Sequence, residues 1–424
     1  MKKRLIIVGG GAAGIFCAIN AARMCEELEV VVIEKTDKLL SKVKISGGGR
    51  CNVTHACFSI SDLVKKYPRG GNFLKKEFRL FNTTDTIEWF ESRDVKLKTE
   101  ADGRIFPESN SSQTIIDCFL REANKQKVTI LLHKNLIDIE IFEETEKQKR
   151  FNLKLYDGEV LTADYLCLAC GGFSKFSQFE MLKNSGHTVV EPVPSLFTFN
   201  IQNDLLNDLA GISLSDLVVK IAGTKLVERG AALITHWGLS GPAVLRLSAW
   251  GAQEFFKKDY ESLIFINWVP QFNESQLREN WANFRKELAT IKIKNKNPFS
   301  LPQRLWDYLI EISGIKPDCK WSELPAKEQN KLIINLCSHE LNVSGKTTFK
   351  EEFVTAGGVD VSEINPSTME SKLIPHLYFA GEIMNIDGIT GGFNFQHAWS
   401  SGFIVAKSIT EGLKQIIFIS EQNM

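Results

Sequence analysis

Residues 5–22, LIIVGGGAAGIFCAINAA, combine an apolar run with three consecutive glycines, and this segment constrains the fold most strongly. The residues before the glycines are typical of a buried strand, and those after them are typical of a helix. Gly9, Gly11 and Gly14 give the spacing GxGxxG. The first glycine makes a tight turn, the second lets the backbone approach a pyrophosphate, and the third lets helix and strand pack closely. The pattern predicts a dinucleotide-binding strand, turn and helix.

The same segment has a second interpretation, because the basic residues 2–4 precede the apolar run as they do in an export signal. Export signals favour an uninterrupted apolar core, whereas glycines interrupt this one. A second apolar run, EVVVIE, follows the helix and ends at Glu34, 20 residues after Gly14. An acid at this position accepts hydrogen bonds from a ribose and repels a 2′-phosphate. We therefore favour a dinucleotide site, to which Ala12, Ala13 and Lys35 also contribute.

Composition limits the partners and the compartment. Lysine plus arginine and aspartate plus glutamate both number 51, so no global field attracts nucleic acid or an anionic membrane, and the sequence indicates no local basic patch. The nine cysteines form no disulfide framework, which predicts a reducing cytoplasm. The pair Cys167 and Cys170 is poorly placed to act as a dithiol on a strand. No apolar run approaches the roughly 20 residues that span a bilayer.

The order of the predicted elements indicates an insertion into an α/β domain. Helices and strands of the first part give way near Glu191 to short strands, and then near Pro270 to amphipathic helices. Strands return after residue 353, and a helix closes the chain. We predict a Rossmann-like domain from residues 1–190 and 353–424, a β-rich insert from residues 191–269 and 342–352, and a helical module from residues 270–341.

A second glycine cluster lies in SGGGRCN, residues 46–52. Glycines permit a close approach of the backbone to a ligand, and the polar side chains around them can bind phosphate or ring heteroatoms. The predicted ligand contacts are Ser46, Gly47, Gly48, Gly49, Arg50, Cys51 and Asn52. Cys51 has two interpretations: Arg50 and amide donors lower its pKa and make it reactive, or it packs in a tight turn.

The third informative stretch is YFAGEIMNIDGITGGFNFQHAWSSG near the C-terminus. A strand runs into a glycine and an acid, and two further glycines precede a closing helix. The free N–H groups of that helix would stabilise negative charge on a reduced flavin, although the turn could equally just close the fold. The predicted contacts here are Gly381, Glu382, Gly391, Gly392, Phe393 and Asn394. The end of the buried strand DYLCLACGG adds Ala169, Cys170 and Gly171.

The segment THWGLSGPAVLRLSAW lies in the predicted insert. Ser240 is placed to cap a helix whose first turn contains Pro242. The functional alternative puts His236, Trp237 and Ser240 at the substrate side of a cofactor, which makes His236 and Ser240 candidate catalytic residues beside Cys51. The histidines show no paired metal-ligand spacing, so we predict no metal site, and GxSxG, P-loop and HExxH motifs are absent from the sequence.

Together, VGGGAAG, SGGGRCNVTH, THWGLSGPAVL, TAGGV, STMESKLIPHLYFAGE and DGITGGFNFQHAWSSG resemble the BaiN-like flavoproteins, some of which are described as aminoacetone oxidases. The resemblance implies an α/β fold, in which a Rossmann-like FAD/NAD(P)-binding domain is interrupted by a β-barrel-like insert with a helical module. It also implies flavin-dependent oxidoreduction with reduced nicotinamide as a possible electron source. Two residues depart from the family pattern: Cys170 replaces a threonine, and Asn385 replaces an aspartate.

We therefore expect a cytoplasmic FAD oxidoreductase that transfers hydride between flavin N5 and a small-molecule substrate, with NAD(P)H as a transient co-substrate. Only one GxGxxG occurs, so no second complete dinucleotide domain is visible. Two alternatives stay open. One is an NAD-dependent dehydrogenase, and the other is a flavin-binding sensor or RNA-associated factor without turnover. The sequence leaves the substrate and the oligomeric state open.

Overall fold

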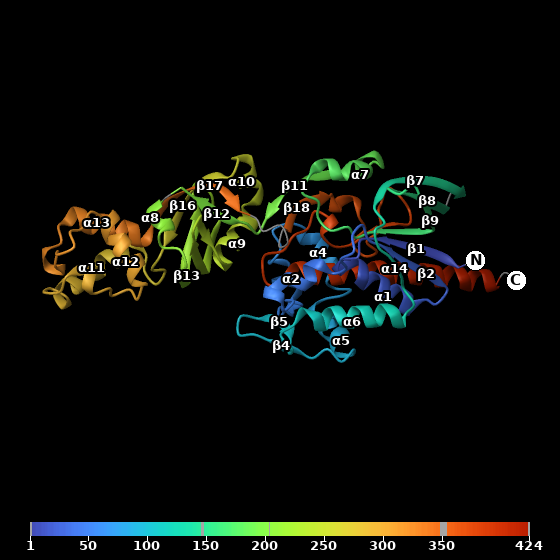
Figure 1. Ribbon diagram of the computed structural model, residues 1–424, viewed down its shortest axis with the longest axis horizontal. Helices are drawn as coiled ribbons and strands as arrows, with labels where there is room; N and C mark the ends of the chain where they lie inside the picture. The colour runs from blue at the N-terminus through green and yellow to red at the C-terminus, as the bar shows by residue number, and fades with distance from the viewer. Residues whose placement is uncertain (1, 146–147, 203, 348–353, 423–424) are drawn as a thin grey trace. The chain divides into compact units, whose positions relative to one another are not determined.

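The computed structural model describes residues 2–145, 148–202, 204–347 and 354–422, and the chain forms two compact units (Figure 1). The discontinuous unit comprises Met1–Pro194 and Lys350–Met424, and the inserted unit comprises Ser195–Phe349. The α/β fold with a barrel-like insert is confirmed, whereas the finer division that sets residues 270–341 apart stays a prediction.

A five-stranded parallel sheet forms the centre of the discontinuous unit. Its order is β19 (Leu377–Phe379), β10 (Tyr165–Leu168), β1 (Lys3–Val8), β2 (Leu28–Ile33) and β6 (Thr129–Leu131). Its central strands are continuous apolar runs because both faces of a parallel sheet are covered. The chain continues from β1 to β2 on one side, while β10 lies on the other. The carboxyl end of β1 is therefore a topological switch point, where α/β sheets bind ligands.

Helices cover one face of this sheet (Figure 1). α1 (Ala12–Met24) packs closely on α14 (Phe393–Gln422), since a Cβ at Gly402 would lie 2.6 Å from the Ala13 carbonyl oxygen. An aromatic cluster fills the space between α1, α14, α5 (Thr83–Glu91) and α6 (Ser112–Lys125); its members are Phe16, Phe81, Trp89, Phe90, Phe119 and Trp399. Ser111 caps α6, because its side chain accepts the Gln113 N–H.

An antiparallel sheet covers the other face of β1. It consists of β7 (Leu136–Thr145), β8 (Gln148–Leu155) and β9 (Val160–Ala163). An Asp-Gly turn joins β8 to β9, and Gly158 has a φ of +86° there. The remaining elements of this unit are α2 (Ser41–Gly49), β3 (Thr54–His55), α3 (Ile60–Val64), α4 (Gly71–Glu77), β4 (Leu97–Thr99), β5 (Arg104–Pro107), η1 (Phe176–Phe179), α7 (Glu180–Asn184), β11 (Val189–Ser195), β18 (Val354–Val359), η4 (Val361–Glu363) and η5 (Gly381–Ile383).

The inserted unit is built on a closed six-stranded barrel. Its order is β12 (Thr198–Ile201), β15 (Gly238–Ser240), β14 (Val227–Thr235), β13 (Ser213–Ile221), β16 (Glu261–Asn267) and β17 (His339–Thr347). Alternate residues of the strands are buried, as they are along β13, because inward and outward positions alternate on a strand. The shorter helices of this unit are α8 (Asp204–Asn207), α9 (Pro242–Trp250) and α10 (Ala252–Lys257).

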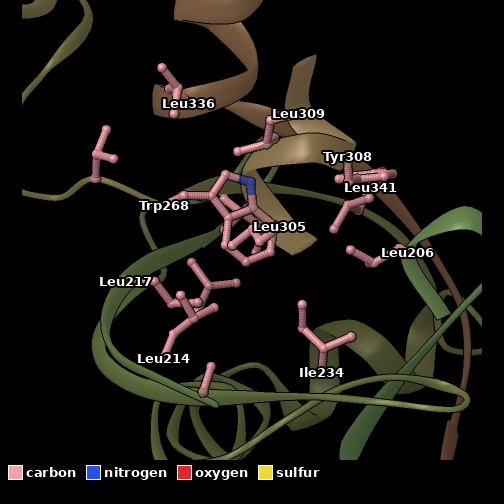
Figure 2. Close-up of a cluster of buried hydrophobic side chains, with 14 of the residues drawn as sticks. Leu206, Leu214, Leu217, Ile234, Trp268, Leu305, Tyr308, Leu309, Leu336 and Leu341 are labelled. Carbon is pink, nitrogen blue, oxygen red and sulfur yellow. The ribbon is translucent and has the colours of Figure 1, made fainter. Parts of the chain in front are cut away.

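Helices α11 (Glu274–Glu287), α12 (Gln303–Ile312) and α13 (Ala326–Cys337) belong to the same unit, with the short turns η2 (Ile293–Asn295) and η3 (Trp321–Glu323). They share one hydrophobic core with the barrel. Figure 2 shows this cluster, in which barrel residues such as Leu214 and Ile234 face Leu309 and Leu336 from the helices, with Trp268 between them. The helices therefore cover apolar surface that the barrel alone would leave exposed.

A buried histidine lies within this shared core. The Trp268 indole N–H donates to His339 Nδ1 over 3.2 Å, and His339 Nε2 lies 3.5 Å from the Tyr308 hydroxyl. Because Nδ1 accepts, the ring proton resides on Nε2 in the neutral form. Burial lowers the pKa of His339 to about 4. His339 is thus a neutral, hydrogen-bonded core residue.

The predicted serine cap of the helix after THWGLSG is wrong. Ser240 ends β15, and the N-cap of α9 is Gly241, with Pro242 at the first helical position. Gly241 has a φ of +97°, and a Cβ there would lie 2.7 Å from the Ala232 Cα. The close approach of β14 thus requires glycine at the position where the sequence pattern favours a serine-capped start.

Candidate functional site

The glycine loop lies at the carboxyl end of β1, and its three motif glycines have different surroundings. Gly9 has a φ of +114°, and a Cβ there would lie 2.4 Å from the Ala169 carbonyl oxygen. A Cβ at Gly14 would lie 2.0 Å from the Gly9 oxygen, so this glycine lets α1 pack on the loop. A Cβ at Gly11 would meet no atom within 4 Å. The turn and packing roles fit the predicted ones, and the second glycine borders open space.

The first turn of α1 presents backbone N–H groups to that space. Gly11 is the N-cap, and within the described residues no side chain caps the helix and no acid lies in its first turn. Helix N-termini of this kind favour an anion, since their N–H groups are unpaired and carry partial positive charge. The loop therefore has the chemistry of a pyrophosphate site.

Glu34 follows β2 and lies against the same loop. Its Oε2 accepts a hydrogen bond from the Gly10 N–H over 2.9 Å. Its Oε1 accepts from the Thr36 N–H and hydroxyl, each over 2.9 Å. Lys35, next in the chain, is exposed. These contacts fix the carboxylate at the edge of the loop and leave Oε2 able to accept another donor, such as a ribose hydroxyl.

The end of β10 forms the other side of the switch point. A Cβ at Gly9 would touch both the Ala169 carbonyl and, at 3.0 Å, the Cys170 Cα. Burial raises the pKa of Cys170 to about 12, so its thiol is neutral. Gly171 has a φ of +76° and a Cβ there would meet nothing within 4 Å. Ala169 and Cys170 thus lie against the glycine loop, and the contact of Ala169, Cys170 and Gly171 with a cofactor stays a prediction.

The second glycine cluster breaks the end of α2. Ser46 has a ψ of 150°, and Gly47, Gly48 and Gly49 all have positive φ. A Cβ at Gly48 or Gly49 would meet nothing within 4 Å. Arg50 is held by three contacts: its Nε donates to the Gly47 carbonyl over 3.3 Å, its guanidinium lies 4.0 Å from the centre of the Phe106 ring, and it bonds Glu100 over 2.6 Å. The backbone at Gly48 and Gly49 therefore borders open space, whereas the arginine already has partners.

Cys51 lies at the end of the same turn and is fully buried, with a φ of +61°. Burial raises the pKa of its thiol to about 12. The reactive-thiol hypothesis requires a lowered pKa, which is the opposite direction. The geometry favours the alternative interpretation, in which Cys51 packs beneath the turn.

Gly381 and Glu382 connect the C-terminal strand to three other elements. Gly381 has a φ of +72°, and a Cβ there would lie 2.9 Å from the Ala13 Cβ in α1. Glu382 Oε2 bonds Lys42 of α2 over 2.6 Å, and its Oε1 accepts the Thr355 N–H of β18 over 2.8 Å. The glycine loop, α2 and the C-terminal strand are therefore neighbours in the folded unit.

The GGFN turn closes the same region. Gly391 and Gly392 have φ values of +130° and +92°. The Asn52 amide, oriented to satisfy both neighbours, donates to the Thr54 carbonyl and accepts the Gly392 N–H over 3.0 Å. The Asn394 side chain bonds both the N–H and the carbonyl of Gly388, and Phe393 stacks on His55 with ring centres 4.8 Å apart. The start of α14 is thus fixed beside SGGGRCN.

Sequence reasoning missed a segment that holds this turn, residues 66–70, which we call the loop clamp. Arg69 forms a two-pronged ion pair with the fully buried carboxylate of Asp387. The Tyr67 hydroxyl donates to the Phe393 carbonyl over 2.6 Å. The Ile389 N–H donates to the Lys66 carbonyl over 2.9 Å. More than 300 residues separate Arg69 from Asp387, so no local spacing could have indicated the pair.

A buried histidine–glutamate pair lies one turn further along α14. His397 Nδ1 and Glu77 Oε1 are 2.8 Å apart, and both side chains are almost fully buried. Burial raises the pKa of Glu77, and the neighbouring histidine opposes that rise. His397 Nε2 and Glu77 Oε2 have no hydrogen-bond partner within the part of the chain that the structure describes. The pair was absent from the predicted site.

The candidate residues of the inserted unit lie in a different setting. His236 is exposed at the turn between β14 and β15, and Ser240 ends β15. They belong to the inserted unit, whereas the glycine loops belong to the discontinuous unit, and their catalytic role stays a prediction. Among the described residues, no group of histidines, cysteines and acids could hold a metal ion, and no helix is long and apolar enough to cross a membrane.

The residues of the discontinuous unit fit an extended dinucleotide. The strongest observation is that both chain ends meet at one switch point, where Gly381 lies against Ala13 and the GGFN turn lies against Asn52. Open space borders Gly11, Gly48 and Gly49. The N-terminus of α1 carries no acid in its first turn, and the same is true of α14. A molecule with a pyrophosphate and an electron-accepting ring matches this distribution of donors.

Comparisons with known proteins identify the family. The HI0933-like protein Rossmann domain matches residues 3–408, and the chain belongs to this family. The ribosomal RNA dihydrouridine synthase of Escherichia coli is 31% identical over 95% of this chain and 97% of its own length. The 3-dehydro-bile acid delta(4,6)-reductase of Clostridium scindens is 27% identical over 96% of this chain and 99% of its own. These matches confirm the resemblance drawn from the motifs.

A solved structure shares the fold. The 3-ketosteroid delta1-dehydrogenase of Sterolibacterium denitrificans, in complex with 1,4-androstadiene-3,17-dione, aligns with a TM-score of 0.50 at 11% identity. The alignment covers 96% of this chain and 99% of that chain. Together with the family, the fold defines this chain as an FAD-dependent oxidoreductase, the class that the motifs predict.

Proposed function

We propose that FAD lies extended across the discontinuous unit, with its ribose at Glu34 and its pyrophosphate at the loop from Gly9 to Gly14. The turns at residues 46–52 and 391–394 would hold the flavin end. When bound, FAD supplies hydride exchange at N5. The contacts that join Gly381 to Ala13 and Asn52 to Gly392 support this proposal most directly, because they bring the two predicted halves of the site together.

The reaction that best fits the relatives is reduction of a carbon–carbon double bond conjugated to a carbonyl. The C. scindens relative is named a Δ4,6 reductase of 3-dehydro bile acids and the E. coli relative a dihydrouridine synthase, and both reactions saturate such a bond. In the overall reaction, NAD(P)H supplies the hydride that is added to the β-carbon and is thereby oxidised to NAD(P)⁺. A proton is added to the α-carbon. The N-terminus of α14 would stabilise negative charge at the flavin while it holds the electrons.

Two substrate classes share this bond. A uracil base within ribosomal RNA is favoured by the E. coli relative, at 31% identity. A small steroid-like enone is favoured by the C. scindens relative, at 27% identity. We propose the uracil base as the first candidate and the small enone as the second.

The reduced nicotinamide would bind transiently, because the sequence holds only one GxGxxG. All nine cysteines are free, which supports a reducing compartment, and we propose the cytoplasm.

Anaerobic reduction of the purified protein tests the proposal. A yellow protein that releases FAD on denaturation should bleach with NADH or NADPH. It should then regain colour when uridine-containing ribosomal RNA or a 3-keto-4-ene steroid is added, and the product should gain two hydrogens by mass spectrometry. A colourless protein that binds NAD would instead indicate the NAD-dependent dehydrogenase. A flavin that neither nicotinamide reduces would indicate the sensor without turnover.

A further inference from the structure

We propose that Lys292, Lys294 and Lys296 form a phosphate-binding surface for RNA on the inserted unit. Residues 291–297, which we call the lysine segment, include the short turn η2, and all three lysines are exposed. This inference rests on the RNA candidate of the proposed function. It adds the surface that would hold the nucleic acid backbone, which lies outside the glycine loops.

The buried side chain of Ile293 and several backbone hydrogen bonds hold the lysine segment in place. Ile293, between the first two lysines, is 1% exposed, and its carbonyl accepts the Trp306 indole N–H over 3.0 Å. Its N–H donates to the Cys319 carbonyl over 3.0 Å. The Lys294 carbonyl accepts a hydrogen bond from the Gln303 amide, also over 3.0 Å. A buried anchor therefore holds the three ammonium groups on one short, well-ordered piece of surface.

This interval of the sequence is basic although the whole chain is balanced, and in the fold Asp307 lies beside it, because the Gln303 amide that donates to the Lys294 carbonyl also donates to Asp307 over 2.9 Å. No aspartate or glutamate occurs between Glu287 and Asp307, whereas Lys292, Lys294, Lys296 and Arg304 lie in that interval. Within the described part of the chain, none of the three lysines forms an ion pair. The interpretation that nothing in the sequence indicates a local basic patch therefore overlooked this interval. Exposed lysines without partner acids can displace counterions from a phosphate backbone.

The residues around the lysines favour RNA over a lipid surface. Membrane-surface segments pair their lysines with exposed tryptophan, phenylalanine or leucine side chains. Here the residues between the lysines are the buried Ile293 and the exposed Asn295, and Ile291, 37% exposed, is the one apolar side chain that the segment exposes. An asparagine amide can donate to and accept from a nucleotide, and it inserts poorly into acyl chains. The chemistry thus fits a polyanion with polar groups between its charges.

The test compares two triple variants of the FAD-loaded full chain. K292Q/K294Q/K296Q removes the surface, and K220Q/K327Q/K331Q removes the same charge from exposed lysines elsewhere on the inserted unit. Binding of a labelled, uridine-containing single-stranded RNA is measured against salt concentration. Three lost phosphate contacts should reduce the slope of log K against log salt by about 2. FAD content and the thermal unfolding midpoint should match the wild type in both variants.

Each outcome decides the proposal. A loss of RNA affinity in the lysine-segment variant alone supports it, even if the wild type fails to reduce uridine, in which case only the RNA substrate is wrong. Equal losses in both variants overturn it, because the effect is then one of net charge. It is also overturned if the segment variant binds RNA like the wild type, whether or not uridine is reduced. Phosphatidylserine vesicles that bind in place of RNA, and depend on the same lysines, overturn it as well.

Discussion

At Gly11, a substitution can test whether the glycine is needed to leave room for a ligand, because its backbone conformation does not itself require glycine. Its φ of −85° and ψ of −167° are open to any residue, and a Cβ there would meet nothing within 4 Å. Gly11→Val should therefore fold normally and yet place its methyl groups where the pyrophosphate would lie. We expect the variant to be purified without FAD, with an unfolding midpoint close to that of wild-type protein stripped of its cofactor. Absorbance of released flavin per mole of protein measures the loss.

Gly412→Ala is the matched control. Gly412 is exposed within α14, and a Cβ there also meets nothing within 4 Å. Alanine should raise helix stability by up to about 1 kcal/mol and leave the FAD content unchanged. Full FAD content in Gly11→Val would contradict the assignment of the pyrophosphate to this loop.

His339 gives a pH-dependent prediction for the inserted unit. Burial lowers its pKa from 6.5 to about 4, so the unfolded chain takes up a proton at a higher pH than the folded chain does. The contribution of neutral His339 to the free energy of unfolding is therefore fully present above about pH 6.5. It is lost as the pH falls towards 4, by about 3 kcal/mol in total. Chemical unfolding of the wild type at pH 7 and pH 5 should show part of this loss.

His339→Gln separates this titration from the rest of the protein. The variant should be less stable than the wild type at pH 7 by about 1–3 kcal/mol, because a flexible amide does not reproduce the ring that lies between Trp268 and Tyr308 in the core. Its stability should then fall less between pH 7 and pH 5. An unchanged pH dependence would assign the acid sensitivity to other groups.

At the residue level, local spacing predicted the glycines well and long-range partners poorly. The turn role of Gly9 and the packing role of Gly14 follow from GxGxxG alone, because both depend on neighbours in the same strand–turn–helix unit. The raised pKa of Cys51 could not be predicted, because it depends on burial that distant segments create. The Arg69–Asp387 pair was missed for the same reason.

Among the elements, the loop clamp and the GGFN turn behave as one structural pair. Arg69 is largely buried, and the side chain of Asp387 is fully buried, so removal of the guanidinium leaves an unpaired carboxylate in the interior. Arg69→Gln should cost about 3–5 kcal/mol of stability. It should also weaken FAD retention and shift the flavin reduction potential, because the turn before α14 loses its support. Equilibrium unfolding, FAD dissociation and a potentiometric titration measure the three effects.

Two further variants distinguish positioning from simple destabilisation. Arg69→Lys keeps a positive charge but loses the two-pronged geometry. Relative to Arg69→Gln, it should therefore regain part of the wild-type stability and a smaller part of the wild-type flavin reduction potential. Arg69→Gln/Asp387→Asn removes both charges and should restore stability relative to Arg69→Gln alone. If the double variant regains stability and also the wild-type potential, then the ion pair only stabilises the loop.

The helices and strands were predictable where the apolar residues of the sequence follow one clear pattern. The strands at residues 3–8 and 28–33 and the helix at residues 12–24 follow from apolar runs on either side of the glycines. The start of α9 was mispredicted, because the choice of Gly241 over Ser240 depends on the distance to β14. Capping preferences depend only on residues that are close in sequence, so they do not account for such a neighbour.

In the whole molecule, the inserted unit begins and ends at one place on the discontinuous unit. The Asp360 N–H donates to the Thr188 carbonyl, and a Cβ at Gly357 would lie 2.4 Å from the Glu191 carbonyl oxygen. These contacts pair β11 with β18 in antiparallel order, so Ser195 and Val354 lie at the same end of this ribbon. The change of character near Glu191 predicted an insertion, but the sequence could not show that its two ends are paired.

Excision of residues 196–349 tests whether the FAD site belongs to the discontinuous unit alone. Because the ends of β11 and β18 are adjacent, a short glycine–serine linker should join them without strain. We expect the shortened protein to unfold cooperatively and to keep FAD, since every proposed contact lies outside the insert. The same deletion carrying Gly11→Val should be colourless, which controls for nonspecific flavin. A soluble, folded and colourless deletion protein would instead show that the inserted unit supplies contacts essential to cofactor binding.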